Sequence, residues 1–343
     1  MAVVATGFFD GVHLGHRLVI DTLLRAARSR GEQSVVVTFW PHPRTVLQKD
    51  ARDLRLLTSL QEKRSILAEM GVDRVEVVDF SKEFRSLTAE EYLRDWVKGR
   101  LGGTAVVLGY DNRMGSDGLS HGQIVPLAQS LGLEVIECAA VSGGSLPGVF
   151  PPENLCHPRQ HKRGGPIACN GGGRTERGDF QGETPPAEAT NQNKAISSTK
   201  IRAALERGEV EAAEAMLGYR YGLHGVVVAG NRLGRTIGYP TANMQLYEPL
   251  KLVPANGVYL VEVETLGRHF SGMTNIGVRP TVSGAGARTI ETHIFDFDEL
   301  IYGLDIRLRF VSKIRDERRF GSLDALKEQL AADELTCRSL LAK

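Results

Sequence analysis

The chain has 343 residues, more than the about 100–200 residues of one typical domain, so we expect two domains. It carries 42 Lys and Arg against 41 Asp and Glu, a net charge of +1 that argues against a dedicated nucleic-acid binder. A small anionic ligand needs only a local patch and stays compatible with this balance. Four cysteines without a CxxC pair favour the reducing cytoplasm, and no apolar run approaches the roughly 18 residues of a membrane span.

Residues 1–142 alternate strand and helix signals. Strand-like runs predict five strands, at Val3–Thr6, Ser34–Phe39, Arg74–Val78, Thr104–Leu108 and Leu133–Cys138. An amphipathic pattern that ends at Gly31 predicts the first helix. Two further helices are predicted by pairs that resemble capping boxes, Thr58 with Gln61 and Thr88 with Glu91. Alternating β and α units predict an α/β domain whose parallel sheet is covered on both faces and binds ligand beyond its C-terminal strand ends.

Residues 143–195 interrupt this pattern. The stretch holds 10 Gly and 7 Pro with little periodicity, so we expect a disordered insert or linker; a gene-model artefact is the alternative. A zinc site is conceivable but not expected, because the Cys and His residues inside it fit no standard spacing. These are Cys156, His157, His161 and Cys169.

Regular signals resume at residue 196. Helix patterns cover Ser197–Gly208 and Glu209–Leu217, and a closing helix is predicted over Ser322–Leu341. Between them lie short strand-like runs, at Gly222–Ala229, Gly257–Glu264, Phe270–Ile276, Thr289–Phe295 and Ile306–Val311. Several short strands with no helix between them predict a sandwich or a small barrel.

The most specific motif is HxGH, formed by His13, Gly15 and His16, at the junction of the first strand and first helix. Gly15 lets a phosphate approach the backbone, and the helix N-terminus offers unpaired N–H groups. Two histidines on the opening turn can donate hydrogen bonds to a pentacoordinate phosphorus and its departing oxygens. The same loop supplies three further nucleotide-binding candidates, Gly7, Phe8 and Asp10. The plainer alternative is a tight glycine turn with incidental histidines.

A second phosphate-binding motif is predicted at Ile196–Arg202, where Ser198 and Thr199 open a helix and Arg202 lies in its first turn. By itself it would be an ordinary serine cap with solvated charges. Together the two motifs resemble those of the nucleotidyltransferase superfamily, in which the HxGH loop and the ISSTxxR helix close around the triphosphate of ATP. The resemblance implies catalytic roles for His13, His16 and Arg202.

Segments at two other strand ends narrow the resemblance. Residues 38–44 and 109–115 look like those of the prokaryotic bifunctional riboflavin kinase/FAD synthetase family, and the similarity covers nearly all of 1–142 and 196–343. In that family the N-terminal domain joins FMN to the AMP moiety of ATP. The resemblance implies flavin binding by His42, Pro43, Arg44 and Asp111, for which a rigid loop and a turn cap are the plainer interpretations. Asn112 and Met114 replace residues that are commonly aromatic in the family.

The second half carries the motif of Gly234–Asn243. Its glycines allow close backbone approach to phosphates, and Thr241 and Asn243 point the same way on an extended chain. Their oxygens suit a Mg²⁺ carried by a nucleotide. The segment resembles the PTAN motif of riboflavin kinases, whose Thr and Asn hold Mg–ATP. We therefore predict a nucleotide and metal site, formed by Gly234, Arg235, Gly238, Thr241 and Asn243.

Glu291 stands where that family has its catalytic glutamate. A carboxylate there can deprotonate the ribityl 5′-hydroxyl as it attacks the γ-phosphate. Without the resemblance, Glu291 would be an exposed strand charge. Arg279 lies in a loop that looks mobile in the family and is a candidate contact to flavin and phosphate, with a solvated loop arginine as the alternative.

The resemblance implies a Rossmann-like nucleotidyltransferase domain over 1–218, interrupted by the insert, and a kinase domain over 219–343. The second is expected to be a small antiparallel six-stranded β-barrel with a C-terminal helix. We expect a monomer or weak homo-oligomer in the cytoplasm that makes FMN from riboflavin and ATP, then FAD from FMN and ATP, using Mg²⁺. The alternative is a riboflavin kinase alone, because the family has only a short connection where this chain has the 53-residue insert.

Overall fold

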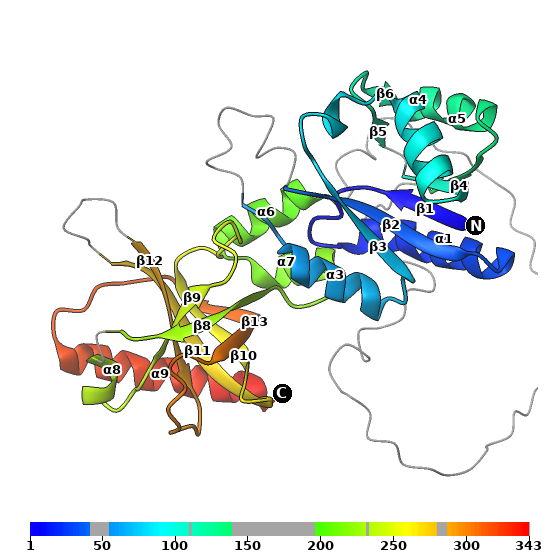
Figure 1. The fold of residues 1–343 in the computed structure, drawn as a ribbon. Helices are drawn as coiled ribbons and strands as arrows, with labels where there is room; N and C mark the ends of the chain where they lie inside the picture. Colours follow the sequence, from blue (N-terminus) through cyan, green and yellow to red (C-terminus); the bar gives the residue numbers. More distant parts are fainter. Residues whose placement is uncertain (42–54, 110–111, 139–195, 231–232, 280–286, 343) are drawn as a thin grey trace, which may run out of the picture.

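The computed structural model describes residues 1–41, 55–109, 112–138, 196–230, 233–279 and 287–342, which form two bodies joined by a pair of helices (Figure 1). The first body holds a five-stranded sheet in the order β3-β2-β1-β4-β7, in which every pair is parallel. Its strands are β1 (Ala2–Thr6), β2 (Gln33–Trp40), β3 (Arg74–Asp79), β4 (Gly103–Leu108) and β7 (Glu134–Glu137). The five predicted strands and the parallel sheet are thus confirmed.

The strand order of this sheet reverses between β1 and β4. In a doubly wound sheet the crevice beyond the carboxyl ends of two such strands is where ligands bind. The loop after β1 carries the HxGH motif, and the segment 109–115 follows β4. Topology alone therefore brings two of the predicted ligand-binding segments to one crevice.

Helices cover both faces of the sheet because its central strands are apolar on both sides. Val3 of β1 packs in one cluster with Leu23, whereas Val4 packs on the opposite face with Leu93 and Ile124. The helices are α1 (Leu14–Arg30) and α3 (Leu60–Glu69) on the first face, and η3 (Tyr92–Arg100) and α5 (His121–Ser130) on the second. Short elements complete this body: η2 (Phe84–Ser86), α4 (Ala89–Glu91), β5 (Arg113–Met114) and β6 (Leu119–Ser120).

Helix α3 starts one residue later than the sequence predicts. Ser59, not Thr58, is its N-cap, and Glu62 completes the capping box. The prediction from Thr58 and Gln61 is wrong because the buried Thr58 side chain bonds to Asp10 instead of to its own helix. The second predicted capping box is confirmed, since Thr88 and Glu91 satisfy each other's backbone N–H at the start of α4.

The second body is a closed antiparallel barrel in the order β10-β11-β12-β9-β8-β13. Its strands are β8 (Gly222–Val228), β9 (Ala242–Leu246), β10 (Gly257–Thr265), β11 (Arg268–Arg279), β12 (Ala287–Ile294) and β13 (Asp305–Arg315). The sequence left sandwich and barrel open, and closure settles it as the six-stranded barrel that the resemblance implied. Helix α9 (Leu323–Leu341) packs outside the barrel, where its Cys337 belongs to one hydrophobic cluster with Met273 and Phe295.

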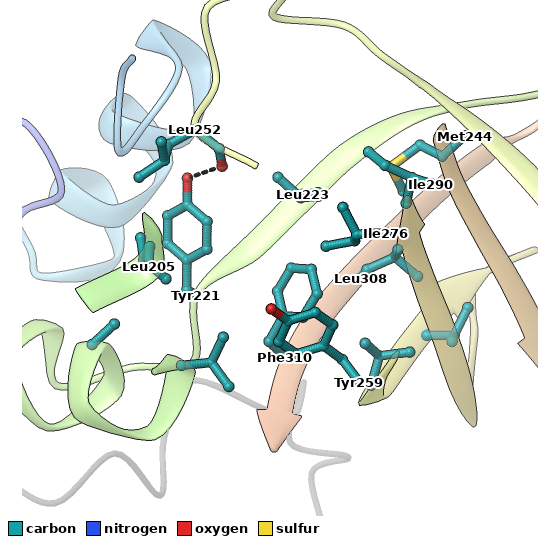
Figure 2. Packing of buried hydrophobic residues seen from close by; sticks show 14 of the residues in the cluster. Leu205, Tyr221, Leu223, Met244, Leu252, Tyr259, Ile276, Ile290, Leu308 and Phe310 are labelled. Carbon is teal, nitrogen blue, oxygen red and sulfur yellow. Dashed lines mark hydrogen bonds between the residues drawn. The ribbon is translucent and has the colours of Figure 1, made fainter. Parts of the chain in front are cut away.

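Helices α6 (Ser198–Arg207) and α7 (Val210–Leu217) lie between the two bodies (Figure 1). Their apolar faces share a hydrophobic cluster with the barrel, in which Leu205 lies near Tyr221 (Figure 2). The Tyr221 hydroxyl donates to the Leu252 carbonyl at 2.6 Å, and the Tyr259 and Phe310 rings meet edge to face. Both helices therefore pack on the barrel while the start of α6 faces the sheet domain. The domain boundary at 218/219 stays a prediction.

None of the helices in the described ranges is long and apolar enough to cross a membrane. The predicted insert 143–195 lies outside the described residues, as do its cysteines and histidines.

Candidate active sites

The loop between β1 and α1 has a strained backbone. Phe9 has φ 47°, Gly11 φ 82° and Val12 φ 36°, although only glycine adopts this region without steric cost. His13 then caps α1, its Nδ1 accepting from the His16 backbone N–H at 3.3 Å. Such strain persists where the surroundings hold it, and it clusters at binding sites. The loop is therefore fixed in a shape that presents both histidines at the helix start.

Burial favours the neutral form of both histidines of the motif. Burial lowers the pKa of His13 from 6.5 to about 4, although nearby Asp10 opposes the shift. Burial also lowers the pKa of His16 well below 6.5, and the stacked His13 ring, 3.6 Å away, adds to the effect. Because Nδ1 of His13 accepts a hydrogen bond, its proton sits on Nε2. His13 therefore carries an N–H donor without a charge, and the His16 Nδ1 atom is buried without a hydrogen-bond partner among the described residues.

Asp10 is the hub of this loop, with 3% of its surface exposed. Its carboxylate accepts from the backbone N–H of Leu57 and of Thr58, each at 3.1 Å, and from the Thr58 hydroxyl. The Arg202 guanidinium forms an ion pair with it. The Thr58 hydroxyl also accepts from the backbone N–H of Gly11 at 3.1 Å. Asp10 thus joins the HxGH loop to the segment 57–58 and to Arg202 of α6. It therefore has a structural role in addition to being a nucleotide-binding candidate.

The predicted second phosphate motif docks on this loop across almost 190 residues of sequence. The Ser198 hydroxyl donates to the Asp10 carbonyl at 3.0 Å, and Ser197 caps α6. Arg202 also donates through Nε to the Arg55 carbonyl at 2.8 Å, so its guanidinium is partly engaged by protein groups. A cavity of about 760 Å³ is shared by the predicted residues of both motifs: Gly7, Phe8, Asp10, His13, Gly15, His16, Ser198, Thr199 and Arg202.

Part of the lining of this cavity is aromatic. Phe8, Phe39, Phe80 and Phe84 lie with ring centroids 5.1–6.3 Å apart, and Met114 lies beside them in the lining. Sequence reasoning missed Phe80, which directly follows β3, and Phe84, which lies in η2. Both residues come soon after the carboxyl end of β3, and this position is the sequence signal that could have identified them. The cavity lining thus combines polar groups at the histidines with apolar aromatic surface suited to a flat ring system.

Lys63 is a buried cation beside the loop that the sequence did not single out. Its ammonium donates to the Thr38 hydroxyl at 3.3 Å, and only 3% of the Lys63 surface is exposed. Burial lowers its pKa from 10.5 to about 8, and the charge of Asp10 counters the shift. Positive charge therefore surrounds Asp10 on two sides, from Lys63 and Arg202.

In the barrel, the segment 234–243 turns from α8 (Leu233–Thr236) into β9. A Cβ on Gly234 would lie 2.1 Å from the Tyr239 carbonyl oxygen, and Gly238 has φ 87°, so the turn itself requires both glycines. Arg235, Thr241 and Asn243 line one cavity of about 250 Å³. The structure therefore places the predicted threonine and asparagine side by side, as their spacing on an extended chain predicts.

Glu291 lies one strand away from this segment. It pairs in register with Asn243 of β9 and with Asn275 of β11, so the three residues form one row across the barrel wall. Directly opposed residues in antiparallel strands have Cβ atoms about 4.5–5.5 Å apart and point to the same face. Asn275 belongs to the segment that sequence reasoning singled out for Arg279, not for itself. The barrel thus brings a carboxylate next to the predicted metal-binding amide.

The donor chemistry at Thr241 and Asn243 fits Mg²⁺. Both are neutral oxygen ligands, and a Mg²⁺ held by a nucleotide keeps waters and phosphates as its other ligands. Gly230 leaves room for this amide, because a Cβ there would lie 2.2 Å from Nδ2 of Asn243. No cluster of three or more His, Cys, Asp or Glu residues that could hold a metal by itself occurs in the ranges that the structure describes.

Five predicted flavin-binding residues remain without a described side chain. Arg279 is the last residue of β11. The other four lie outside the described residues: His42, Pro43, Arg44 and Asp111.

Comparisons with known proteins match the two parts of the chain to two different family models. A family model described as FAD synthetase matches residues 1–146, and one described as riboflavin kinase matches residues 217–341. The bifunctional riboflavin kinase/FMN adenylyltransferase of Bacillus subtilis is 32% identical over 335 residues, covering 97% of this chain and 90% of its own length. That of Escherichia coli K12 is 36% identical over 337 residues, covering 98% and 91%.

Among solved structures, a Streptococcus pneumoniae chain described as a macrolide-efflux protein has the same overall arrangement. It is 31% identical, with a TM-score of 0.79, over 98% of this chain and 93% of its own length. The similarity therefore extends through both bodies.

Proposed function

The chain belongs to the family of bifunctional riboflavin kinase/FMN adenylyltransferases, and from this premise we propose which residues perform each of its two reactions. The protein phosphorylates riboflavin to FMN with ATP and transfers the adenylyl group of a second ATP to FMN, giving FAD and pyrophosphate. The observation that carries our assignment is that the structure has two separate sites. One is the HxGH loop at the sheet, and the other is the group of Thr241, Asn243 and Glu291 on the barrel.

In adenylyl transfer, the triphosphate of ATP binds between the HxGH loop and the start of α6. An oxygen of the FMN phosphate forms a bond to the α-phosphorus, the bond from that phosphorus to the bridging oxygen breaks, and pyrophosphate leaves. His13 and His16 stabilise the pentacoordinate centre as neutral hydrogen-bond donors. The Thr199 hydroxyl donates to a phosphate oxygen, and Ser198, whose hydroxyl is held by the Asp10 carbonyl, offers its backbone N–H at the start of α6. Arg202 holds Asp10 while it faces the same cavity.

The flavin of this site binds at the aromatic part of the cavity lining. Phe39, Phe80 and Phe84 offer apolar surface for an isoalloxazine ring, and Met114 can pack against it without being aromatic. His42, Pro43, Arg44 and Asp111 keep their predicted role in holding the flavin.

In the kinase reaction, Gly234, Arg235 and Gly238 form the nucleotide loop, and Thr241 and Asn243 hold Mg–ATP. A Mg²⁺ held there with the nucleotide would supply positive charge that offsets the charge of the phosphates during transfer. Glu291 takes the proton of the ribityl 5′-hydroxyl as that oxygen bonds to the γ-phosphorus and ADP leaves. Arg279 contacts flavin and phosphate at the end of β11.

The remaining expectations concern the protein's surroundings. We place it in the cytoplasm as a monomer or weak homo-oligomer whose ligands are riboflavin, FMN and ATP, not nucleic acid or membrane. The alternative of a kinase with an impaired adenylyltransferase domain is motivated by the length of residues 143–195. Loop-closure entropy grows slowly with length, so a long connection need not prevent α6 from docking.

The test replaces Glu291 by Gln and measures the two reactions separately, riboflavin with Mg–ATP and supplied FMN with Mg–ATP. Loss of a general base lowers kcat of phosphorylation about 10²–10⁴-fold, and FAD formation from FMN should stay unchanged. Glu264→Gln is the matched control, since this β10 carboxylate pairs with Arg309 away from the cavity. Loss of both activities in Glu291→Gln, or of neither, refutes the assignment. Wild-type protein that folds but forms no FAD from FMN supports the kinase-only alternative.

A further inference from the structure

A short segment of the first domain joins the HxGH loop to the barrel. Leu56 donates its backbone N–H to the Leu250 carbonyl at 2.7 Å and accepts from the Leu252 N–H at 2.8 Å. These bonds pair Leu56 with Lys251 as a parallel bridge between residues nearly 200 positions apart. The barrel loop 250–252 is therefore attached to the strand-like segment directly before α3.

The Lys251 side chain reaches from the barrel into the first domain. Its ammonium donates to the Leu57 carbonyl at 2.7 Å and to Oε2 of Glu62 at 2.6 Å, and only 5% of the residue surface is exposed. It also lies 4.8 Å from the centre of the Tyr221 ring. A cation so deeply buried is tolerated because these partners replace its water.

The peptide group that accepts from Lys251 is the same one that donates to Asp10. The Leu57 carbonyl faces the ammonium, and the N–H of that peptide, on Thr58, donates to Oδ1 of Asp10 at 3.1 Å. A single peptide unit thus lies between a buried cation and a buried carboxylate. Charge-assisted bonds are about twice as strong as neutral ones, and bonds in a chain polarise one another.

From Asp10 the chain of contacts continues to the groups that face the triphosphate. The same carboxylate forms the ion pair with Arg202, and Ser198 donates to the Asp10 carbonyl. A change at the Leu57–Thr58 peptide therefore shifts the carboxylate that holds the ATP-binding helix against the HxGH loop. No described contact of Lys251 reaches the kinase cavity.

We propose that Lys251, a residue of the kinase barrel, is a positioning residue for adenylyl transfer in the other domain. It acts through the Leu57–Thr58 peptide and Asp10, so FAD formation depends on the docked barrel while FMN formation does not depend on this contact. The inference rests on the proposed function, in which the HxGH loop and α6 bind the adenylyl donor.

The experiment uses the full chain with Lys251→Met, which keeps an unbranched stem and leaves the Leu56 backbone bonds in place. For adenylyl transfer from ATP to supplied FMN, we expect kcat/KM for ATP to fall about 10- to 100-fold, since a displacement of about 1 Å in a positioned site has effects of this size. The kinase kcat and KM for ATP should stay unchanged. Lys251→Arg, which keeps a cationic donor, should recover most of the loss, and Lys327→Met on exposed α9 is the control for loss of one lysine charge.

A double-mutant cycle separates this chain of contacts from a general weakening. Thr58→Val removes the hydroxyl between Asp10 and Gly11, and combined with Lys251→Met it should lower kcat/KM by less than the product of the two single effects. If Lys251→Met fails to fold, Lys251→Gln carries the same expectation.

Three results would overturn the inference: unchanged adenylyl transfer in Lys251→Met, equal loss of both activities, or no recovery in Lys251→Arg. Wild-type protein without adenylyl transfer would instead refute the proposed function.

Discussion

The buried carboxylate of Asp10 gives the sharpest test of how the first site is held together. Asp10→Asn keeps the shape of the side chain and removes its charge. Leu57, Thr58 and Arg202 all donate to this carboxylate. In the variant one of the two acceptor oxygens is replaced by an NH₂ group, so a donor there faces other donors. The Arg202 side chain, 13% exposed, is left without its buried counter-charge.

The magnitude follows from the burial of that pair. Removing one partner of a buried ion pair costs about 3–5 kcal/mol, and we take the lower end because Arg202 retains some solvent contact. A loss of about 3 kcal/mol lowers the Tm of a domain of 150–250 residues by about 6–12 °C. Adenylyl transfer should weaken as well, since the HxGH loop loses its anchor to the segment before α3.

The two tryptophans of the chain allow this domain to be followed by itself. Trp40 and Trp96 both lie in the first domain, so tryptophan fluorescence during heating reports its unfolding, and kinase activity reports the barrel. Asp73→Asn is the control, because this exposed carboxylate accepts from the Ser34 backbone N–H and hydroxyl without a buried cation. A loss below about 1 kcal/mol in Asp10→Asn would contradict the reasoning.

Two further predictions follow from the histidine pair and from a glycine of the barrel. Between pH 6.5 and about 4 the unfolded chain binds a proton at His13 that the folded chain does not. The free energy of unfolding therefore falls as the pH falls through this range, by up to about 3 kcal/mol from this residue, and the His13 contribution is constant above it. Unfolding followed by tryptophan fluorescence should show a smaller dependence of the unfolding free energy on pH in His13→Gln than in the wild type. An unchanged pH dependence would contradict this prediction. In Gly230→Ala the new Cβ would lie 2.2 Å from Nδ2 of Asn243, so the amide must move away. The kinase KM for ATP should then rise about tenfold, with adenylyl transfer intact. Gly321→Ala, where no atom lies within 4 Å of the new Cβ, is its control, and an equal effect there would reject the argument.

Much of the fold could be predicted because its signals are local. The five strands of the first domain fall in short strand-like runs, and Gly31 ends α1 with φ 63° as a helix stop should. Strand β9 had no such signal, since Ala242–Leu246 contains Asn and Gln and forms only because its backbone pairs with β8 and β12. Likewise Thr58 matched the pattern of a helix cap, yet a bond to Asp10, 48 residues away, claimed its side chain.

The two sites divide in the same way. The residue types that can handle phosphate were evident from local sequence, because HxGH and the Thr–x–Asn spacing are short patterns whose chemistry depends on neighbours along the chain. That Asp10, Arg202 and Lys251 belong to one chain of contacts, and that Glu291 stands beside Asn243, became evident from the folded chain alone. Those relations depend on strand register and domain docking, which bring together residues up to about 200 positions apart, and no local pattern of apolar and polar residues encodes them.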